Sequence, residues 1–335
     1  MRLEDLDFSY PEALVAQEPR RPSRVLWVEN GEPRELEWGP FLNQFRSGDS
    51  LVVNNTKVIP RRVFGKAGDK EFETLFLDPV DESRRIWKVL CPAGRLKRGE
   101  AILFPGGVQG TIRQGGRPQT LELTQALSEN YFFEVGEMPL PPYIQKARGE
   151  RHQRKADRDW YQSIFAKIDG SQAAPTASLH FSEQDLGELR SRGVQIVPVT
   201  LHVGLGTFLP IETHEVLEHV MHQEHFEVPE ESWQAIQKTK AAGGRIWALG
   251  TTATRAVESY ARGIHGGTTE LFLHPEEQPR VVDILLTNFH QPRTTLLLLV
   301  AAFSNLKTLH AGYRWAVERS FRLFSYGDLT VWVRE

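Results

Sequence analysis

The segment RIWALGTTATRAVES, residues 245–259, changes its hydrophobic pattern partway along. RIWAL is a short apolar run of the kind found in buried strands, and Gly250 ends it. From Thr251 to Arg262 the apolar residues recur at helical spacing. We therefore predict a strand that passes directly into a helix, the repeating unit of α/β domains.

The same alternation continues on both sides of this segment. Ser182 and Asp185 are placed like a capping box at the start of a helix, and Gly193 stands where that helix should stop. Strands alternating with helices predict an α/β domain, with either a barrel-like or an open sheet. The further predicted helices are 229–242, 292–303 and 309–323, and the further predicted strands are VQIVPVTL, VVDILLT and LTVWV.

The middle of the chain has a different texture. Between about Phe64 and Val135 the apolar runs are short and show no helical spacing, which predicts a small antiparallel β-barrel or sandwich. Because the residues before this region again resemble an α/β domain, we predict that the domain is discontinuous. It comprises residues 1–62 and 140–335, and residues 63–139 form an inserted β-barrel domain. The short runs are EFETLFLD, RIWKVLC, AILF, VQGTIR, TLELT and YFFEV.

Composition excludes several classes of protein. The chain of 335 residues has one cysteine, Cys91, so it can form no intrachain disulfide and no zinc or iron–sulfur site built from several thiolates. A single cysteine fits the reducing cytosol, where we expect the protein. We also expect it to be a monomer. The longest apolar run, Leu296–Phe303, has eight residues, whereas a membrane helix needs about 20. We therefore expect no membrane partner and interpret the run as a buried helix.

Local charge points to a polyanionic partner. The net charge is −3, yet basic residues gather in the runs Lys57–Lys66, Arg84–Arg98 and Lys146–Arg158. Each run alone is compatible with a solvated face. Three runs in a mildly acidic protein together favour a polyanionic partner.

Six stretches combine polar residues with an adjacent apolar strand or a turn. Four of them lie at the end of a predicted strand, where open α/β sheets bind ligands. This shared position predicts one composite site, although each stretch is also compatible with an ordinary turn. The stretches are VVNNTKVIPRR (52–62), AAPTASLHF (173–181), VTLHVGLGTFLP (199–210), WALGTTATRAVES (247–259), LLTNFHQPRTTLLLLVAAF (285–303) and LFSYGDL (323–329).

These stretches, in this order, resemble the S-adenosylmethionine:tRNA ribosyltransferase-isomerase family of queuosine biosynthesis. The resemblance extends from Asp7 to Asp328. It also includes SYPEALVAQEP, MPLPPYI and HVMHQEHFEV, and its longest and most specific segments are VTLHVGLGTFLP and LLTNFHQPRTTLLLLVAAF.

The resemblance implies a reaction in which S-adenosylmethionine is a co-substrate and donates its ribosyl part. The acceptor is the aminomethyl group of a deazaguanine at the wobble position of tRNA, and the products are epoxyqueuosine-tRNA, adenine and methionine. A proton next to the sulfonium is lost first, adenine leaves, the amine attacks, and methionine departs as the epoxide closes. The sulfonium acidifies the C–H bond, so the reaction requires no metal.

The resemblance also implies site residues. Proton transfer falls to His180, His202, His222, Glu224 or His290, and the sequence leaves the base among them open. We expect His180, His202, Arg255 and His290 to converge on one pocket. The expected substrate-binding residues are Asn54, Asn55, Thr56, Lys57, Pro175, Thr176, Gly204, Gly206, Thr207, Thr251, Thr252, Arg255, Glu258, Asn288, Tyr326 and Asp328.

Two other functions stay open on the sequence. A methyltransferase would release S-adenosylhomocysteine instead of adenine. A tRNA-binding protein without activity would not bind S-adenosylmethionine, and its polar stretches would serve only as core and turns.

Overall fold

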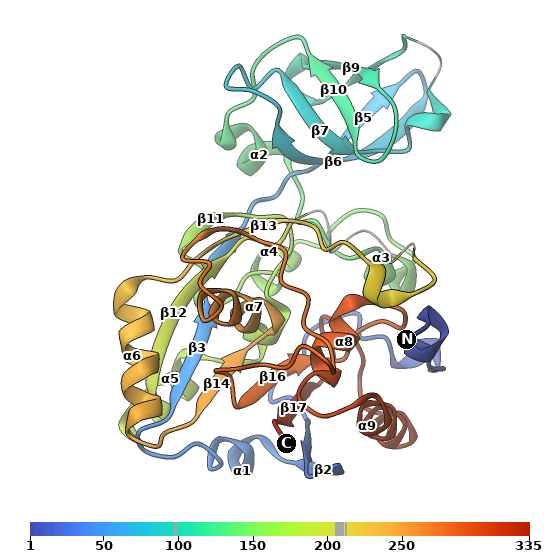
Figure 1. Cartoon of the computed structure of the whole chain (residues 1–335). Helices are drawn as coiled ribbons and strands as arrows, with labels where there is room; N and C mark the ends of the chain where they lie inside the picture. The colour runs from blue at the N-terminus through green and yellow to red at the C-terminus, as the bar shows by residue number, and fades with distance from the viewer. Residues whose placement is uncertain (97–98, 205–210, 212) are drawn as a thin grey trace. The chain divides into compact units, whose positions relative to one another are not determined.

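The computed structural model describes residues 1–96, 99–204, 211 and 213–335. The chain divides into two compact units (Figure 1). The α/β unit comprises Met1–Lys57, Pro141–Glu150 and Asp159–Glu335, and the barrel unit comprises Val58–Leu140 and Arg151–Arg158. The predicted fold class, a discontinuous α/β domain with an inserted antiparallel β-barrel, is confirmed. The domain boundaries predicted at 62/63 and 139/140 stay a prediction.

A nine-stranded open sheet, counted over the described residues, forms the centre of the α/β unit. Its middle strands β12, β3, β14 and β16 are parallel, whereas β17 runs antiparallel to β16. In sheet order the strands are β15 (Gly267–Thr269), β13 (Glu224–Glu227), β12 (Gln195–Leu201), β3 (Ser50–Asn54), β14 (Ile246–Leu249), β16 (Ile284–Asn288), β17 (Leu329–Val333), β1 (Val25–Glu29) and β2 (Glu32–Leu36).

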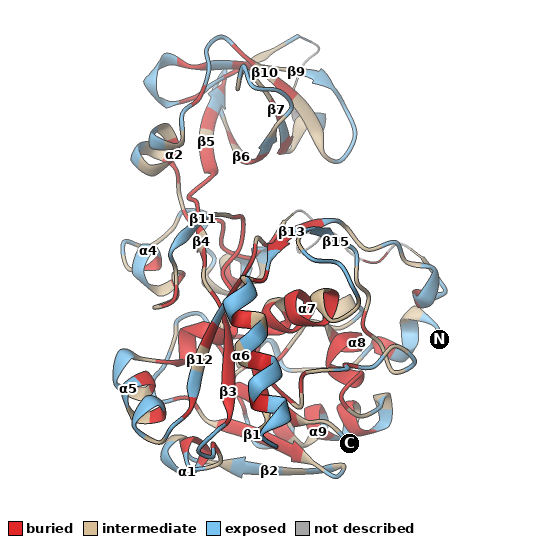
Figure 2. Ribbon diagram, turned by 60° about the vertical axis from the view of Figure 1, so that its left-hand side comes forward, coloured by how far each residue is buried: buried red, intermediate tan, exposed pale blue. Residues whose placement is uncertain are grey.

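The sheet is buried on both faces, which explains why its central strands are apolar without alternation. In β3, Val52 packs into one hydrophobic cluster, whereas Leu51 and Val53 pack into another on the opposite face. Figure 2 shows α6 with buried residues towards the sheet and exposed residues outward. Helices α6 (Glu230–Ala241), α7 (Thr251–Tyr260), α8 (Thr295–Ala301) and α9 (Leu306–Glu318) contribute to the first cluster, and α1 (Trp38–Leu42) and α5 (Glu183–Ser191) to the second.

The barrel unit is a closed antiparallel barrel. Side chains such as Phe76, Trp87 and Leu121 fill its interior. In barrel order the strands are β10 (Gln119–Leu123), β7 (Ile86–Leu90), β6 (Lys70–Pro79), β5 (Arg62–Ala67), β8 (Ala101–Leu103) and β9 (Gln109–Gln114). The short strand β4 (Thr56–Val58), just before the barrel strands, pairs instead with β11 (Ile168–Ser171), which follows them in the chain.

One apolar run predicted as a strand is a helix. YFFEV belongs to α2 (Glu129–Val135), so the strand prediction was wrong there. The hydroxyl oxygen of Ser128 accepts a hydrogen bond from the Tyr131 backbone N–H at 3.4 Å and caps the helix, while Phe132 is buried against the barrel. A capped helix of seven residues, about two turns, with one buried residue shows too little periodicity to be recognised as helical.

Three cations from the predicted basic runs are engaged inside the barrel unit. Arg61 Nη2 lies 2.8 Å from Glu129 Oε1, and Arg62 Nη2 lies 2.7 Å from Glu137 Oε2, with both arginines buried. Arg84 Nη2 also donates to Glu129 Oε1, at 2.5 Å. These side chains hold the barrel's own carboxylates, so the basic runs are not wholly surface charge.

No single helix in the described part of the chain is long and apolar enough to cross a membrane. Helices α8 and α9 reach that length and composition only as a pair, and they are bent by 106° relative to each other.

Candidate active site

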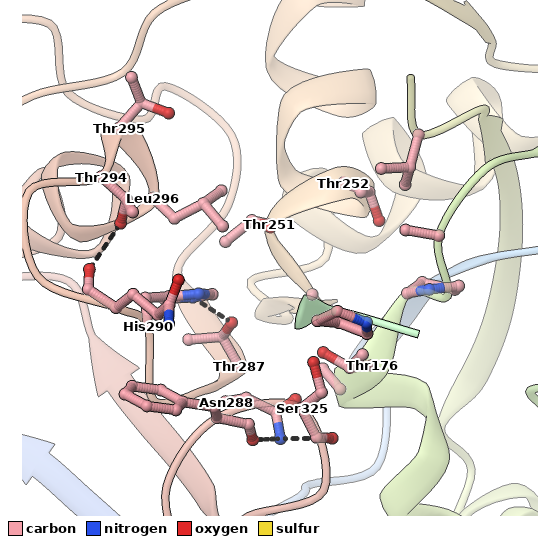
Figure 3. A pocket seen from close by; sticks show the side chains of 18 of the residues that line it. Thr176, Thr251, Thr252, Thr287, Asn288, His290, Thr294, Thr295, Leu296 and Ser325 are labelled. Atoms are coloured by element: carbon pink, nitrogen blue, oxygen red, sulfur yellow. Dashed lines mark hydrogen bonds between the residues drawn. The ribbon is translucent and has the colours of Figure 1, made fainter. Parts of the chain in front are cut away.

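A cavity of about 340 Å³ lies within the α/β unit. Two of its walls follow directly from parallel strands, since Gly250 comes after β14 and Asn288 ends β16. Figure 3 shows Thr287, Asn288 and His290 together on the segment that ends β16, with Thr251 and Thr252 coming from the start of α7. The cavity therefore occupies the position at which open α/β sheets bind ligands.

The start of α7 is open towards this cavity. Gly250 precedes the helix with φ of 95°, a backbone conformation that glycine adopts without strain. No side chain caps the helix, and both Thr251 and Thr252 line the cavity. Uncapped N–H groups and the helix dipole together favour an anion at this point.

A buried ion pair stands on the wall next to α7. Arg255 Nη1 donates to Glu224 Oε2, and Arg255 Nε donates to the Leu271 carbonyl at 3.2 Å. Glu224 Oε1 accepts from the Gly204 backbone N–H at 3.1 Å. Arg255 Nη2 is buried and has no partner among the described residues. The guanidinium is thus fixed in place and keeps one donor group unused.

A second wall is built around the amide of Asn288. Its Nδ2 donates to the Phe324 carbonyl at 3.0 Å and lies 3.1 Å from His180 Nε2. His180 Nδ1 lies 2.6 Å from the hydroxyl of Ser23. Burial, with a smaller effect from the charge of Arg21, lowers the pKa of His180 to about 3, so the imidazole is neutral. His180 therefore supports Asn288 from behind and does not line the cavity.

His290 lines the cavity as a neutral imidazole. Burial lowers its pKa to about 3. Its Nε2 lies 2.9 Å from the hydroxyl of Thr287 (Figure 3). Its backbone N–H donates to the Tyr313 hydroxyl at 2.9 Å. Nδ1 has no hydrogen-bond partner among the described residues, so this nitrogen remains available to a ligand.

The expected convergence of four residues holds for Arg255 and His290 only. His180 lies behind Asn288, and His202 lies elsewhere, with its Nδ1 2.7 Å from the Thr56 hydroxyl and its ring stacked on His225. Among the expected site residues, those that line the cavity are Pro175, Thr176, His222, Glu224, Thr251, Thr252, Arg255, Asn288 and His290.

The other expected substrate-binding residues do not line this cavity, and two of them illustrate why. Asn54 ties β3 to β12 by accepting from the Leu201 N–H and donating to its carbonyl, and Glu258 is fully buried with three backbone N–H groups and Arg262 bonded to it. Both side chains hold the fold together. The residues outside the lining are Asn54, Asn55, Thr56, Lys57, Gly204, Glu258, Tyr326 and Asp328, and Gly206 and Thr207 lie outside the described residues.

Some lining residues were not expected from the sequence. Tyr143, which follows two prolines at the start of α3 (Pro142–Arg148), and Tyr161 both line the cavity, as does Ser325. The prolines before Tyr143 signalled only a return between domains, and no polar pattern surrounds Tyr161. Ser325 lies in the stretch LFSYGDL, so that stretch was the available signal.

A cavity at strand ends, with an uncapped helix, a fixed guanidinium and a neutral imidazole around it, defines an α/β enzyme with a small-molecule site. The chain belongs to the queuosine biosynthesis protein family, whose model matches residues 3–331.

Relatives agree with this assignment over the whole chain. The proteins named S-adenosylmethionine:tRNA ribosyltransferase-isomerase from Citrifermentans bemidjiense and Staphylococcus epidermidis are 43% and 40% identical to it, each alignment covering 98% of both chains. The crystal structure of S-adenosylmethionine tRNA ribosyltransferase from Thermotoga maritima is 29% identical, with a TM-score of 0.54, over 98% of this chain and 99% of that one.

Proposed function

We propose that this chain transfers and isomerises the ribosyl moiety of S-adenosylmethionine onto the aminomethyl-deazaguanine at the wobble position of tRNA. The products are epoxyqueuosine-tRNA, adenine and methionine. Family membership along the whole chain supports this activity. The structural observation that carries it is the cavity with an anion site at the start of α7, which suits a substrate ending in a carboxylate.

The direct test is incubation of the protein with deazaguanine-modified tRNA and S-adenosylmethionine, followed by nucleoside analysis. We expect epoxyqueuosine in the tRNA and one adenine released per modified base. Release of S-adenosylhomocysteine would identify a methyltransferase instead. Binding of tRNA without any turnover would identify a protein that only binds RNA.

We assign the methionyl carboxylate to Arg255 and the first N–H groups of α7. The unused Nη2 of Arg255 can donate to a carboxylate oxygen, and the helix dipole favours the negative charge. Glu224 keeps the guanidinium in position, since its two oxygens already accept from Arg255 and from the Gly204 N–H. We therefore place Glu224 in substrate binding and not in proton abstraction.

Proton transfer then falls to His222 or His290, which both line the cavity. His290 is uncharged at neutral pH and can accept a proton at Nδ1. A low pKa makes His290 a weak base, so proton abstraction falls to His222, and His290 suits a hydrogen-bonding role towards the departing adenine. His222→Asn and His290→Asn separate the two: loss of the base lowers turnover while the dissociation constant of S-adenosylmethionine stays unchanged.

We propose that exposed cations of the barrel unit contact tRNA phosphates. Lys66, Arg85 and Lys88 are exposed members of the basic runs, in contrast to the arginines that pair inside the barrel. Lys97 and Arg98 lie outside the described residues. A wobble base must leave its stack to reach chemistry in a cavity, so phosphate contacts would hold the strand while the base is extruded.

We further propose that the enzyme acts as a monomer in the cytosol, without a metal, and that residues 63–139 form the inserted domain. The single cysteine, Cys91, suits a reducing compartment. The acidity conferred by the sulfonium makes a metal unnecessary. Sedimentation at micromolar concentration tests the monomer, retention of activity in EDTA tests the metal, and limited proteolysis tests the domain boundaries.

A further inference from the structure

Two polar side chains of the cavity wall carry a buried atom that has no hydrogen-bond partner among the described residues. They are Arg255, through Nη2, and Asn288, through Oδ1. Arg255 belongs to α7 and Asn288 ends β16. An unpaired buried polar atom is costly, and at a functional site it points to a ligand that completes it. One of these atoms is a donor on a cation and the other is an acceptor on a neutral amide.

The orientation of the Asn288 amide is fixed by its neighbours. The nitrogen position faces the carbonyl oxygens of Phe324 and Ser325, at 3.0 and 3.4 Å, and these oxygens can only accept. The NH₂ group must therefore point to them, so His180 Nε2 is an acceptor and His180 Nδ1 carries the proton that Ser23 accepts. The amide oxygen, Oδ1, is the remaining atom.

We infer that Asn288 Oδ1 accepts an N–H group of the bound substrate, while Arg255 Nη2 donates to its carboxylate. This inference rests on the proposed function. S-adenosylmethionine carries a carboxylate at its methionine end and an exocyclic amine on its base, so the two atoms set its direction in the cavity. The methionine end lies at the start of α7 and the base lies at the end of β16. His180 is a positioning residue that adds a third contact to the Asn288 NH₂ group, beside the Phe324 and Ser325 carbonyls that fix the orientation of the amide.

The same chemistry could come from the second substrate, because the acceptor base of the tRNA also carries amine groups. An acceptor-only atom excludes neither source, but it does exclude a carbonyl oxygen or an unprotonated ring nitrogen at that point. Binding measured without tRNA separates the two sources.

The test compares S-adenosylmethionine with an analogue in which hydrogen replaces the exocyclic amine. Calorimetry on the wild-type protein without tRNA requires no variant. We expect the analogue to bind at least about tenfold more weakly, because Asn288 Oδ1 then loses its partner. Asn288→Ala should bind the two ligands equally.

Two more variants distinguish recognition from stability. Asn305 caps α9 through its side chain and lies outside the cavity lining, so Asn305→Ala should keep the full preference for the amine. His180→Ala should reduce the preference only in part, because the Asn288 NH₂ group loses one bond but is still held by the Phe324 and Ser325 carbonyls. It should leave binding of the deaminated analogue unchanged. A general loss of packing would weaken both ligands alike.

The outcomes are distinct. If both ligands bind the wild type equally, but Asn288→Ala raises the KM for modified tRNA severalfold, the N–H group belongs to the acceptor base and the role of Asn288 stands. If Asn288→Ala changes neither quantity while turnover persists, the inference is overturned and the proposed function survives. Failure of the wild type to bind S-adenosylmethionine would overturn both.

Discussion

Each unit of this protein contains a buried arginine that pairs with a glutamate, and the surroundings of the two pairs differ. In the barrel unit, Arg62 pairs with Glu137, donates to the Arg151 carbonyl at 2.8 Å and stacks 5.2 Å from the Phe64 ring. In the α/β unit, Arg255 pairs with Glu224 on the wall of a cavity. The same kind of ion pair therefore lies within packed structure in one unit and lines a cavity in the other.

The largest expected effect comes from removing one partner of each pair. Arg62→Ala and Arg255→Ala should each destabilise the protein by about 3–5 kcal/mol, because each removes a buried guanidinium together with its ion pair. Only Arg255→Ala should also weaken S-adenosylmethionine binding, by about 100-fold. Chemical denaturation measures the first effect, and calorimetry on the folded protein measures the second.

Arg255→Lys supplies the control for this comparison. It keeps a positive charge near Glu224 but loses the planar guanidinium that can reach the glutamate and a ligand together. We expect most of the stability to return and most of the binding loss to remain. If Arg62→Ala weakens S-adenosylmethionine binding as much as Arg255→Ala does, the distinction between the two pairs fails.

The second prediction concerns the stability of each unit at acidic pH, because the two units bury different titratable groups. The folded pKa values of His180 and His290, about 3, lie below the ordinary value of 6.5. Above 6.5 neither histidine affects stability. As the pH falls below 6.5, these histidines bind protons in the unfolded chain but not in the folded protein, so the folded protein loses stability. At about pH 5 the loss is about 2 kcal/mol for each histidine.

The barrel unit should withstand this range. Burial alone would raise the pKa values of Glu129 and Glu137, but Arg84 and Arg61 beside the first, and His152 and Arg62 beside the second, leave both pKa values lowered. Their stabilisation is present above the ordinary value of 4.5 and is lost only as the pH falls below it.

Hydrogen exchange read out by peptide at about pH 7 and pH 5, corrected for intrinsic rates, measures this difference. We expect protection to fall in the peptides of the α/β unit first. His180→Asn and His290→Asn should flatten its pH dependence. Equal loss of protection in both units at about pH 5 would contradict the prediction.

The secondary structure of the α/β unit was largely predictable from the sequence, whereas its strand pairing was not. The alternation of strands and helices after residue 182 predicted α5, α6, α7 and β14 to within two residues, because hydrophobic spacing reports which face of an element is buried. It left the sheet as barrel-like or open, and the structure shows an open sheet whose end strands, β15 and β2, do not pair with each other. Strand pairing over such sequence distances leaves no local pattern to recognise.

The site was predicted less well than the fold, for a physical reason. Thr251, Asn288 and His290, chosen for their position at strand ends, all line the cavity. The same criterion could not separate His180 from them, since that depends on which side of Asn288 the imidazole lies. Charge runs had the same weakness. Arg61 is buried against Glu129, and nothing in a run of cations shows which of them finds an internal partner.

The third prediction concerns the exposed cations of the barrel unit. Changing Lys66, Arg85 and Lys88 together to Ser should weaken tRNA binding about tenfold and reduce the slope of log affinity against log salt by about 2. S-adenosylmethionine binding should not change, because these residues belong to the barrel unit and the cavity lining belongs to the α/β unit. Affinity measured across a salt series decides the matter, and an unchanged slope would leave these residues as solvated surface.

The smallest expected effect compares two serine helix caps, one in each unit. Ser182 accepts from the Asp185 N–H at 3.3 Å at the start of α5, and Ser128 accepts from the Tyr131 N–H at 3.4 Å at the start of α2. Replacing either by Ala should cost about 1 kcal/mol. If the units unfold separately, that loss shifts the Tm of the smaller barrel unit by about 4–8 °C and that of the larger α/β unit by about 2–4 °C, because the smaller unit has the smaller unfolding entropy. Calorimetry of the full chain should then show Ser128→Ala moving one transition and Ser182→Ala moving the other. A single transition that both variants shift equally would mean that the barrel and the α/β unit unfold as one body, and the contrast between them would be confined to chemistry.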